Sequence, residues 1–191
     1  MKKSLIALIV VGVIVFSVLS WGIGTRNNLV SMNEEVRLEA SQVETQLQRR
    51  SDLIPNFVAT VKGYAAHEEE VYSAIADARA KLSGAIEDGD VAAMNEANSQ
   101  LDSALSRLLV VVENYPELKA NQNFIALQDE LAGTENRIAI ARQNYNTTVE
   151  SYNKEIKMFP ASLIANMCGF TEAEYFEASE SAKDAPVVNF E

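Results

Sequence analysis

The chain has 191 residues, and its 8 Gly and 4 Pro are few beside its many helix formers, a composition that favours an all-α fold. Its 27 acidic residues outnumber the 16 basic ones, which argues against nucleic acid as a partner, since binding nucleic acid needs a basic surface. A single Cys excludes an internal disulfide, and with a single His it excludes metal sites built on clusters of these residues. No nucleotide-binding, metalloprotease or dithiol motif occurs, so we expect no enzymatic activity and no catalytic, cofactor or metal site.

The N-terminus consists of a short basic segment, residues 1–4, followed by an uncharged apolar stretch over residues 5–23. Nineteen helical residues rise by ~28 Å, about the thickness of one hydrocarbon core, so this stretch predicts a transmembrane helix. Its anchoring residues include Leu5, Ile9, Val13, Phe16, Leu19 and Trp21. A cleaved signal peptide is the alternative, but the stretch is longer than a usual signal core and lacks an A-x-A site.

Charge indicates how this helix is oriented. Lys2 and Lys3 precede it, whereas only Arg26 and Arg37 follow it closely, which favours a cytoplasmic N-terminus and an extracytoplasmic domain. All 27 acidic residues follow the helix and 14 basic residues remain there, leaving a net charge of −13. Because anionic headgroups repel such a domain, we expect it to stand off the membrane surface.

Beyond the anchor, apolar residues recur in steps of three, four or seven from residue 27 to 83, which predicts one long helix. Pro55 lies inside this helix and predicts a kink, since it lacks an N–H and crowds the preceding turn. The apolar pattern resumes after Pro55, which favours a bend over an end. Two glycines then end the helix, and Asp90 is placed to cap the next one.

The later elements follow from the same spacing. Helices are expected at residues 90–113, 117–158 and 160–168, followed by an acidic extended tail at 170–191. Heptad spacings such as Ile138, Tyr145 and Tyr152 predict shallow, coiled-coil-like packing. The expected fold is therefore all-α, with a transmembrane helix continuing into an antiparallel bundle of three long helices and a short fourth over residues 27–169.

Three strings carry a family resemblance: QLQRRSDLIPNFVATVKGYAAHE from Gln46, LQDELAGTENRIAIARQNYNTTVESYN from Leu127, and FPASLIANMCGF from Phe159. Together with the N-terminal anchor, they resemble the LemA family over nearly the whole chain. The resemblance implies a bacterial, membrane-anchored antiparallel helical bundle, with a relative that takes part in forming the magnetosome membrane, and it implies no activity. Positions that match the family pattern include Arg50, Asp52, Pro55, Asn56, Glu135, Arg142, Tyr145, Asn146, Tyr152, Asn153, Phe159 and Pro160.

The polar residues of this set lie beside the expected kink and along the expected third helix. Antiparallel pairing would bring their opposite charges together, so we interpret them as a polar network that fixes helix register. A ligand or partner site at the kink is the alternative. Tyr145 and Tyr152 share one helix face, which we interpret as aromatic core with hydroxyls at its rim, rather than as a binding ladder.

The sequence thus predicts a scaffold or interaction protein in the bacterial cytoplasmic membrane, with its N-terminus cytoplasmic and its domain extracytoplasmic. Expected partners are the lipid bilayer, further copies of the chain in a homo-oligomer, and an unidentified envelope protein. The alternative is an extracytoplasmic sensory or regulatory module that binds a small ligand and acts on a partner membrane protein.

Overall fold

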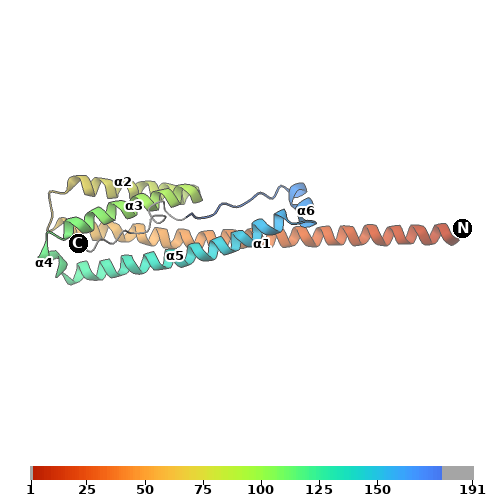
Figure 1. The fold of residues 1–191 in the computed structure, drawn as a ribbon, viewed down its shortest axis with the longest axis horizontal. Helices are drawn as coiled ribbons and strands as arrows, with labels where there is room; N and C mark the ends of the chain where they lie inside the picture. The colour runs from red at the N-terminus through yellow and green to blue at the C-terminus, as the bar shows by residue number, and fades with distance from the viewer. Residues whose placement is uncertain (1, 178–191) are drawn as a thin grey trace, which may run out of the picture. The chain divides into compact units, whose positions relative to one another are not determined.

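The computed structural model describes residues 2–177, and within them the prediction of an all-α fold is confirmed (Figure 1). Its helices are α1 (Lys2–Lys62), α2 (Glu69–Asp88), α3 (Val91–Val112), α4 (Pro116–Lys119), α5 (Gln122–Lys157) and α6 (Ala161–Cys168). Of the expected acidic tail, residues 178–191 lie outside the described residues.

The chain divides into two compact units, each described here by itself. The anchor unit comprises Met1–Glu39 and Thr147–Ala173, and the bundle unit comprises Ala40–Asn146 and Glu174–Glu191. Helices α1 and α5 therefore contribute to both units, while α2, α3 and α4 belong to the bundle unit and α6 to the anchor unit.

The single helix expected over residues 27–83 is wrong, because the chain turns back between Lys62 and Glu69. In the turn, the amides of Tyr64 and Ala65 both donate to the carbonyl of Val61. The hydroxyl of Tyr72 then donates to the carbonyl of Ala65 at 2.6 Å, which fixes the start of α2. Apolar residues on both sides of the turn face one core, so a hairpin and a straight helix share the same apolar spacing.

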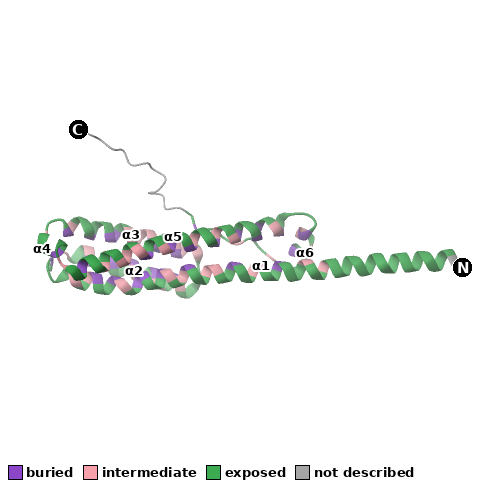
Figure 2. Cartoon of the chain, turned by 90° about the horizontal axis from the view of Figure 1, so that it is seen from below, coloured by how far each residue is buried: buried purple, intermediate pink, exposed green. Residues whose placement is uncertain are grey.

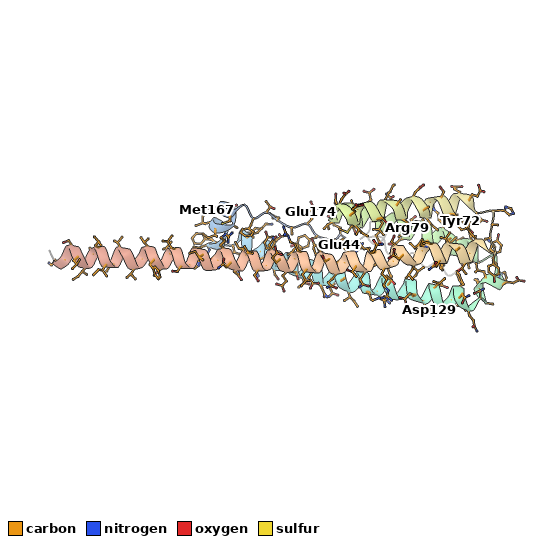
Figure 3. All side chains as sticks on the ribbon, turned by 180° about the vertical axis from the view of Figure 1, so that it is seen from behind. Glu44, Tyr72, Arg79, Asp129, Met167 and Glu174 are labelled. Atoms are coloured by element: carbon orange, nitrogen blue, oxygen red, sulfur yellow. The ribbon has the colours of Figure 1, made fainter. Side chains whose placement is uncertain are left out.

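Helix α1 continues through Pro55, as the resumed apolar pattern predicts. A proline in a helix cannot donate to the carbonyl four residues earlier, which leaves the carbonyl of Ser51 without its helical partner. The Nε of Arg79 on α2 donates to this carbonyl at 2.9 Å, and Figure 3 labels Arg79 on the side of α2 toward α1. Pro55 thereby supplies an acceptor that docks α2 on α1.

This pairing predicts a coupled pair of substitutions. Arg79→Leu is expected to cost about 1–2 kcal/mol of stability, since it leaves the buried Ser51 carbonyl unpaired. In a Pro55→Ala background the restored amide donates to Ser51 instead, so the same substitution is expected to cost under about 0.5 kcal/mol. Urea unfolding of the four proteins in a double-mutant cycle measures the difference, and additive costs would contradict this role for Pro55.

In the bundle unit, α1, α2, α3 and α5 lie side by side (Figure 1). Arg49 and Phe57 of α1 meet Glu130 and Phe124 of α5 in reverse order, so these two helices are antiparallel. The phenyl rings of Phe57 and Phe124 stack with centroids 5.2 Å apart. The core residues of this unit include Val43, Leu47, Ile54, Ile75, Leu82, Met94, Leu101, Leu108, Leu118 and Ile138.

The helix ends in this unit follow local chemistry. Helix α2 passes through Gly84 and ends at Gly89, whose φ of 68° lies in the left-handed region that favours glycine. Asp90 caps α3 as predicted, accepting from the amide of Ala93 at 2.9 Å. The uninterrupted helix expected over 117–158 is wrong, because Asn121 separates α4 from α5 and its side chain accepts from the amides of Asn123 and Phe124.

The anchor unit begins with a part of α1 that nothing covers. Every residue from Lys3 to Trp21 is exposed, as Figure 2 shows in green. Farther along α1, Leu29 and Val36 are buried, and the buried side chains of α5 here include Val149 and Ile156. The structure thus separates a bare apolar stretch from a packed one within one helix.

Candidate functional site

The Arg50 side chain is buried, with only 6% exposed, and it forms the centre of a charge cluster in the bundle unit. One guanidinium nitrogen donates to Asn98 at 2.8 Å and lies 2.7 Å from a carboxylate oxygen of Glu135. The other donates to Asp102, which also accepts from Asn98 at 3.1 Å. We call Arg50, Asn98, Asp102 and Glu135 the Arg50 cluster; it ties α1, α3 and α5 together.

Arg142 on α5 is influenced by the charges of this cluster. Burial lowers the pKa of its guanidinium, whereas Glu135 and Asp102 raise that pKa and Arg50 lowers it. The Nε and one terminal nitrogen of Arg142 are buried without a hydrogen-bond partner. Because an unpaired buried charge is costly, the carboxylates of Glu135 and Asp102 favour this alignment of the helices.

The sequence interpretation and the structure overlap only in part here. Arg50 and Glu135 form an ion pair, and α3 adds Asn98 and Asp102, which the sequence reasoning missed. The sequence feature that could have revealed them is a polar residue, Asn98, at an apolar position of the α3 stripe. Asp102 follows four residues later, one helical turn away on the same face.

Three other predicted members lie outside the Arg50 cluster. Asp52 is exposed and accepts from Gln48 of its own helix at 2.8 Å. Pro55 and Asn56 are also exposed. Pro55 instead acts through the carbonyl of Ser51.

A pocket of 380 Å³ opens beside the Arg50 cluster, between α1, α3 and α5. Its charged end carries Arg50, Asp102 and Glu135, and its walls are largely apolar. The other lining residues are Phe57, Leu105, Ser106, Leu109, Gln128, Leu131 and Ala132. This volume lies within the range of small-ligand sites, and apolar walls with a few convergent polar groups are typical of them.

In the anchor unit, Tyr152 and Asn153 bind the backbone that follows α6. The Tyr152 hydroxyl donates to the carbonyl of Thr171 at 3.0 Å. The Asn153 amide accepts from the N–H of Ala173 at 2.9 Å and donates to its carbonyl at 2.8 Å. One asparagine therefore satisfies both backbone groups of one residue.

In the bundle unit, Tyr145 and Asn146 repeat the arrangement on the next residues of the tail. The Tyr145 hydroxyl donates to the carbonyl of Glu174 at 2.9 Å. Asn146 accepts from the N–H of Phe176 at 2.9 Å and donates to its carbonyl at 2.8 Å. The Phe176 ring meets the Tyr145 ring edge-on with centroids 5.1 Å apart, and the Arg142 guanidinium lies 5.2 Å from its centroid.

These repeated pairs explain the heptad spacing of the two Tyr-Asn dipeptides. Seven helical residues and three extended residues both advance a chain by ~10 Å, so pairs seven apart on α5 suit backbone positions three apart. The tyrosine rings are buried, and their hydroxyls bind the chain's own tail. The hydrogen bonds of both pairs go to backbone groups of the tail.

The two tyrosines predict a loss of stability at high pH. Burial raises the pKa of Tyr152, and burial followed by the charge of Glu174 raises the pKa of Tyr145. An unfolded chain ionises its tyrosines near pH ~10, so their contribution is full below that pH and is lost as pH rises through the higher folded pKa values. Hydrogen exchange of residues 171–177 across this range should accelerate less in a Tyr145→Phe, Tyr152→Phe variant, and equal acceleration would contradict the assignment.

The last two predicted site residues, Phe159 and Pro160, are exposed in the turn between α5 and α6. Within residues 2–177, no group of three or more His, Cys, Asp or Glu side chains could hold a metal ion.

The fold and these sites define a class: a helical-bundle protein in which, over residues 2–177, one helix is long and apolar enough to cross a membrane, judged by length and composition. The chain belongs to the LemA family, whose sequence model matches residues 39–190. It is 30% identical to magnetosome protein MamQ 2 of Paramagnetospirillum magneticum, with 85% of this chain and 68% of that protein covered. It is also 30% identical to protein LemA of Metamycoplasma hominis, with 87% and 78% covered.

Proposed function

We propose that this chain is a membrane-anchored helical scaffold of the bacterial cell envelope that self-associates through its helical domain. The observation that carries the proposal is the bare apolar stretch of α1. Its side chains include Leu8, which is 71% exposed, and Phe16, which is 72% exposed. A continuous apolar surface of this length is unfavourable in water and matches the thickness of a hydrocarbon core.

The charges around this stretch support its orientation. Lys2 and Lys3 precede it, and a strongly acidic domain follows it, so the N-terminus would lie in the cytoplasm and the domain outside. Trp21, which is 42% exposed at the end of the span, suits the membrane–water interface.

The pocket supports self-association. Leu109, which is 39% exposed, and the half-buried Leu131 line it, and an apolar helix or chain segment would cover them.

Membrane fractionation tests the anchor. Val10→Lys with Ile14→Lys puts two charges at the centre of the span, where each is expected to cost about 3 kcal/mol of insertion. We expect wild-type protein to resist alkaline extraction and this variant to be released. The control is Val30→Lys with Leu38→Lys, two exposed positions on the same helix beyond the span, which should stay in the membrane. Release of wild-type protein would overturn the proposal.

The size of the pocket favours a second candidate, a sensory module that binds a small ligand. A photocrosslinking residue at Leu109, in the pocket wall, distinguishes the scaffold from the sensory module in living cells. Capture of a second copy of the chain supports the scaffold. A small-molecule adduct found by mass spectrometry supports the sensor instead.

A further inference from the structure

The end of α5, the turn after it and α6 contain an unusually long uncharged run in an otherwise highly charged domain. No Asp, Glu, Lys or Arg occurs between Lys157 and Glu172, and we call residues 158–171 the uncharged segment. Lys157 and Glu172 form an ion pair at 2.7 Å, so the two ends of the segment are held together by one charged pair. The segment therefore leaves and returns to α5 as a closed loop.

The large side chains of this segment are exposed rather than packed. Phe159 is 79% exposed and Met167 is 82% exposed, and Figure 3 labels Met167 on α6. The large apolar side chains left uncovered are Met158, Phe159, Leu163 and Met167. The buried residues of α6 are the small Ala161 and Ala165. Helix α6 thus buries its alanines and leaves the bulky Leu163 and Met167 exposed, the reverse of a helix in a water-soluble core.

The uncharged segment lies against the end of the proposed membrane span. Ile164 of α6 approaches Gly22 of α1, where an added Cβ would lie 3.5 Å from its terminal carbon. Gly22 follows Trp21 at the C-terminal end of the apolar stretch. All of these residues belong to the anchor unit, so their placement does not depend on the bundle unit.

We propose that the uncharged segment is a second membrane contact, which inserts Phe159, Leu163 and Met167 into the bilayer interface beside α1. The occupant of this surface is phospholipid. The surface is continuous with the apolar stretch of α1, and inserting it desolvates no charged side chain. Lys157, at the end of α5, would keep its ammonium at the headgroups. This inference rests on the proposed membrane span.

Such a contact would have a mechanical consequence. A single transmembrane helix is free to rotate and tilt in the bilayer, and interfacial residues restrict that freedom. A second contact beside Gly22 would fix the rotation of α1 about its own axis. Each copy would then present the same face of α1 to its neighbours.

Fluorescence in reconstituted full-length protein tests the inference, because the chain holds a single Cys and a single Trp. Cys168 is exposed on α6 and accepts a polarity-sensitive fluorophore, while Trp21 reports on the span. In phosphatidylcholine–phosphatidylglycerol vesicles, we expect nitroxides high on the acyl chains to quench the Cys168 label more than aqueous iodide does. The same label on Ser73→Cys in a Cys168→Ser background, on the acidic α2, should show the opposite preference.

Substitutions provide the matched control. Phe159→Gln with Met167→Gln is expected to lower the inserted population at least about tenfold, since each apolar side chain favours insertion. Val110→Gln with Ile140→Gln removes two exposed apolar side chains of the bundle unit and should leave the quenching of the Cys168 label unchanged. All four side chains are exposed, so folding should persist, as circular dichroism will check.

Trp21 keeps the two proposals distinguishable. Lipid quenching of Trp21 with iodide quenching of the Cys168 label would leave the span intact and overturn the second contact. Loss of lipid quenching at both positions would overturn the span itself. A label shielded from both quenchers, with self-quenching that grows with protein density, would show that a second copy covers α6 and would also overturn the inference.

Discussion

Arg50→Leu is expected to lower the free energy of unfolding by about 2–3 kcal/mol, because it leaves Asp102 and Glu135 without the buried cation they face. The side chains of these acids are 42% and 48% exposed, so water compensates for part of the loss. Urea unfolding of the full-length chain in detergent, followed by circular dichroism, measures the effect.

Arg49→Leu is the matched control. Arg49 pairs with Glu130 at 2.7 Å, but its side chain is 56% exposed, so its loss should cost under about 0.5 kcal/mol. Equal losses of unfolding free energy in the Arg50→Leu and Arg49→Leu variants would contradict the claim that burial makes the Arg50 ion pairs important. Replacing Arg50, Asp102 and Glu135 together by apolar residues should recover much of the stability. If that triple variant is stable but no longer self-associates, the Arg50 cluster also serves binding.

Asn146→Ala with Asn153→Ala is expected to release the tail without unfolding the helices. The double variant loses four hydrogen bonds to backbone groups, two at Ala173 and two at Phe176. At about 0.5–1.5 kcal/mol each, this removes about 1–3 kcal/mol of local stability at each residue. Amide hydrogen exchange at Ala173 and Phe176 should therefore accelerate about 5- to 150-fold.

Two other asparagines of α5 provide the control for this prediction. Asn136 and Asn144 are exposed, so Asn136→Ala with Asn144→Ala should leave exchange in the tail unchanged. Unchanged exchange in the Asn146, Asn153 variant would show that the tail is held by side-chain packing, for instance of Phe176, rather than by these amides.

The sequence predicted the features that depend on local chemistry. The helical composition, the apolar stripes and the cap at Asp90 all follow from residues close together in the chain. The turn at Gly63 and the break at Asn121 escaped prediction, because apolar spacing continues unchanged across them and one Gly or Asn is a weak signal.

A contact within the sites was predictable only where the side chains of both partners show complementary chemistry in the sequence. Opposite charges on Arg50 and Glu135 suggested their pairing, whereas Asn98 and Asp102 looked like ordinary members of an amphipathic helix. The tail contacts of Asn146 and Asn153 escaped prediction for a different reason. Their partners are backbone groups, which every residue carries, so no side-chain pattern in the tail reveals them.

Native mass spectrometry of the full-length chain released from lipid nanodiscs tests the central claim most directly. A self-associating, membrane-anchored scaffold predicts a defined oligomer that retains bound phospholipid. The Val10→Lys, Ile14→Lys variant should fail to enter the nanodiscs. A lipid-bound monomer at every protein density, together with no crosslinked copy in cells, would contradict the account.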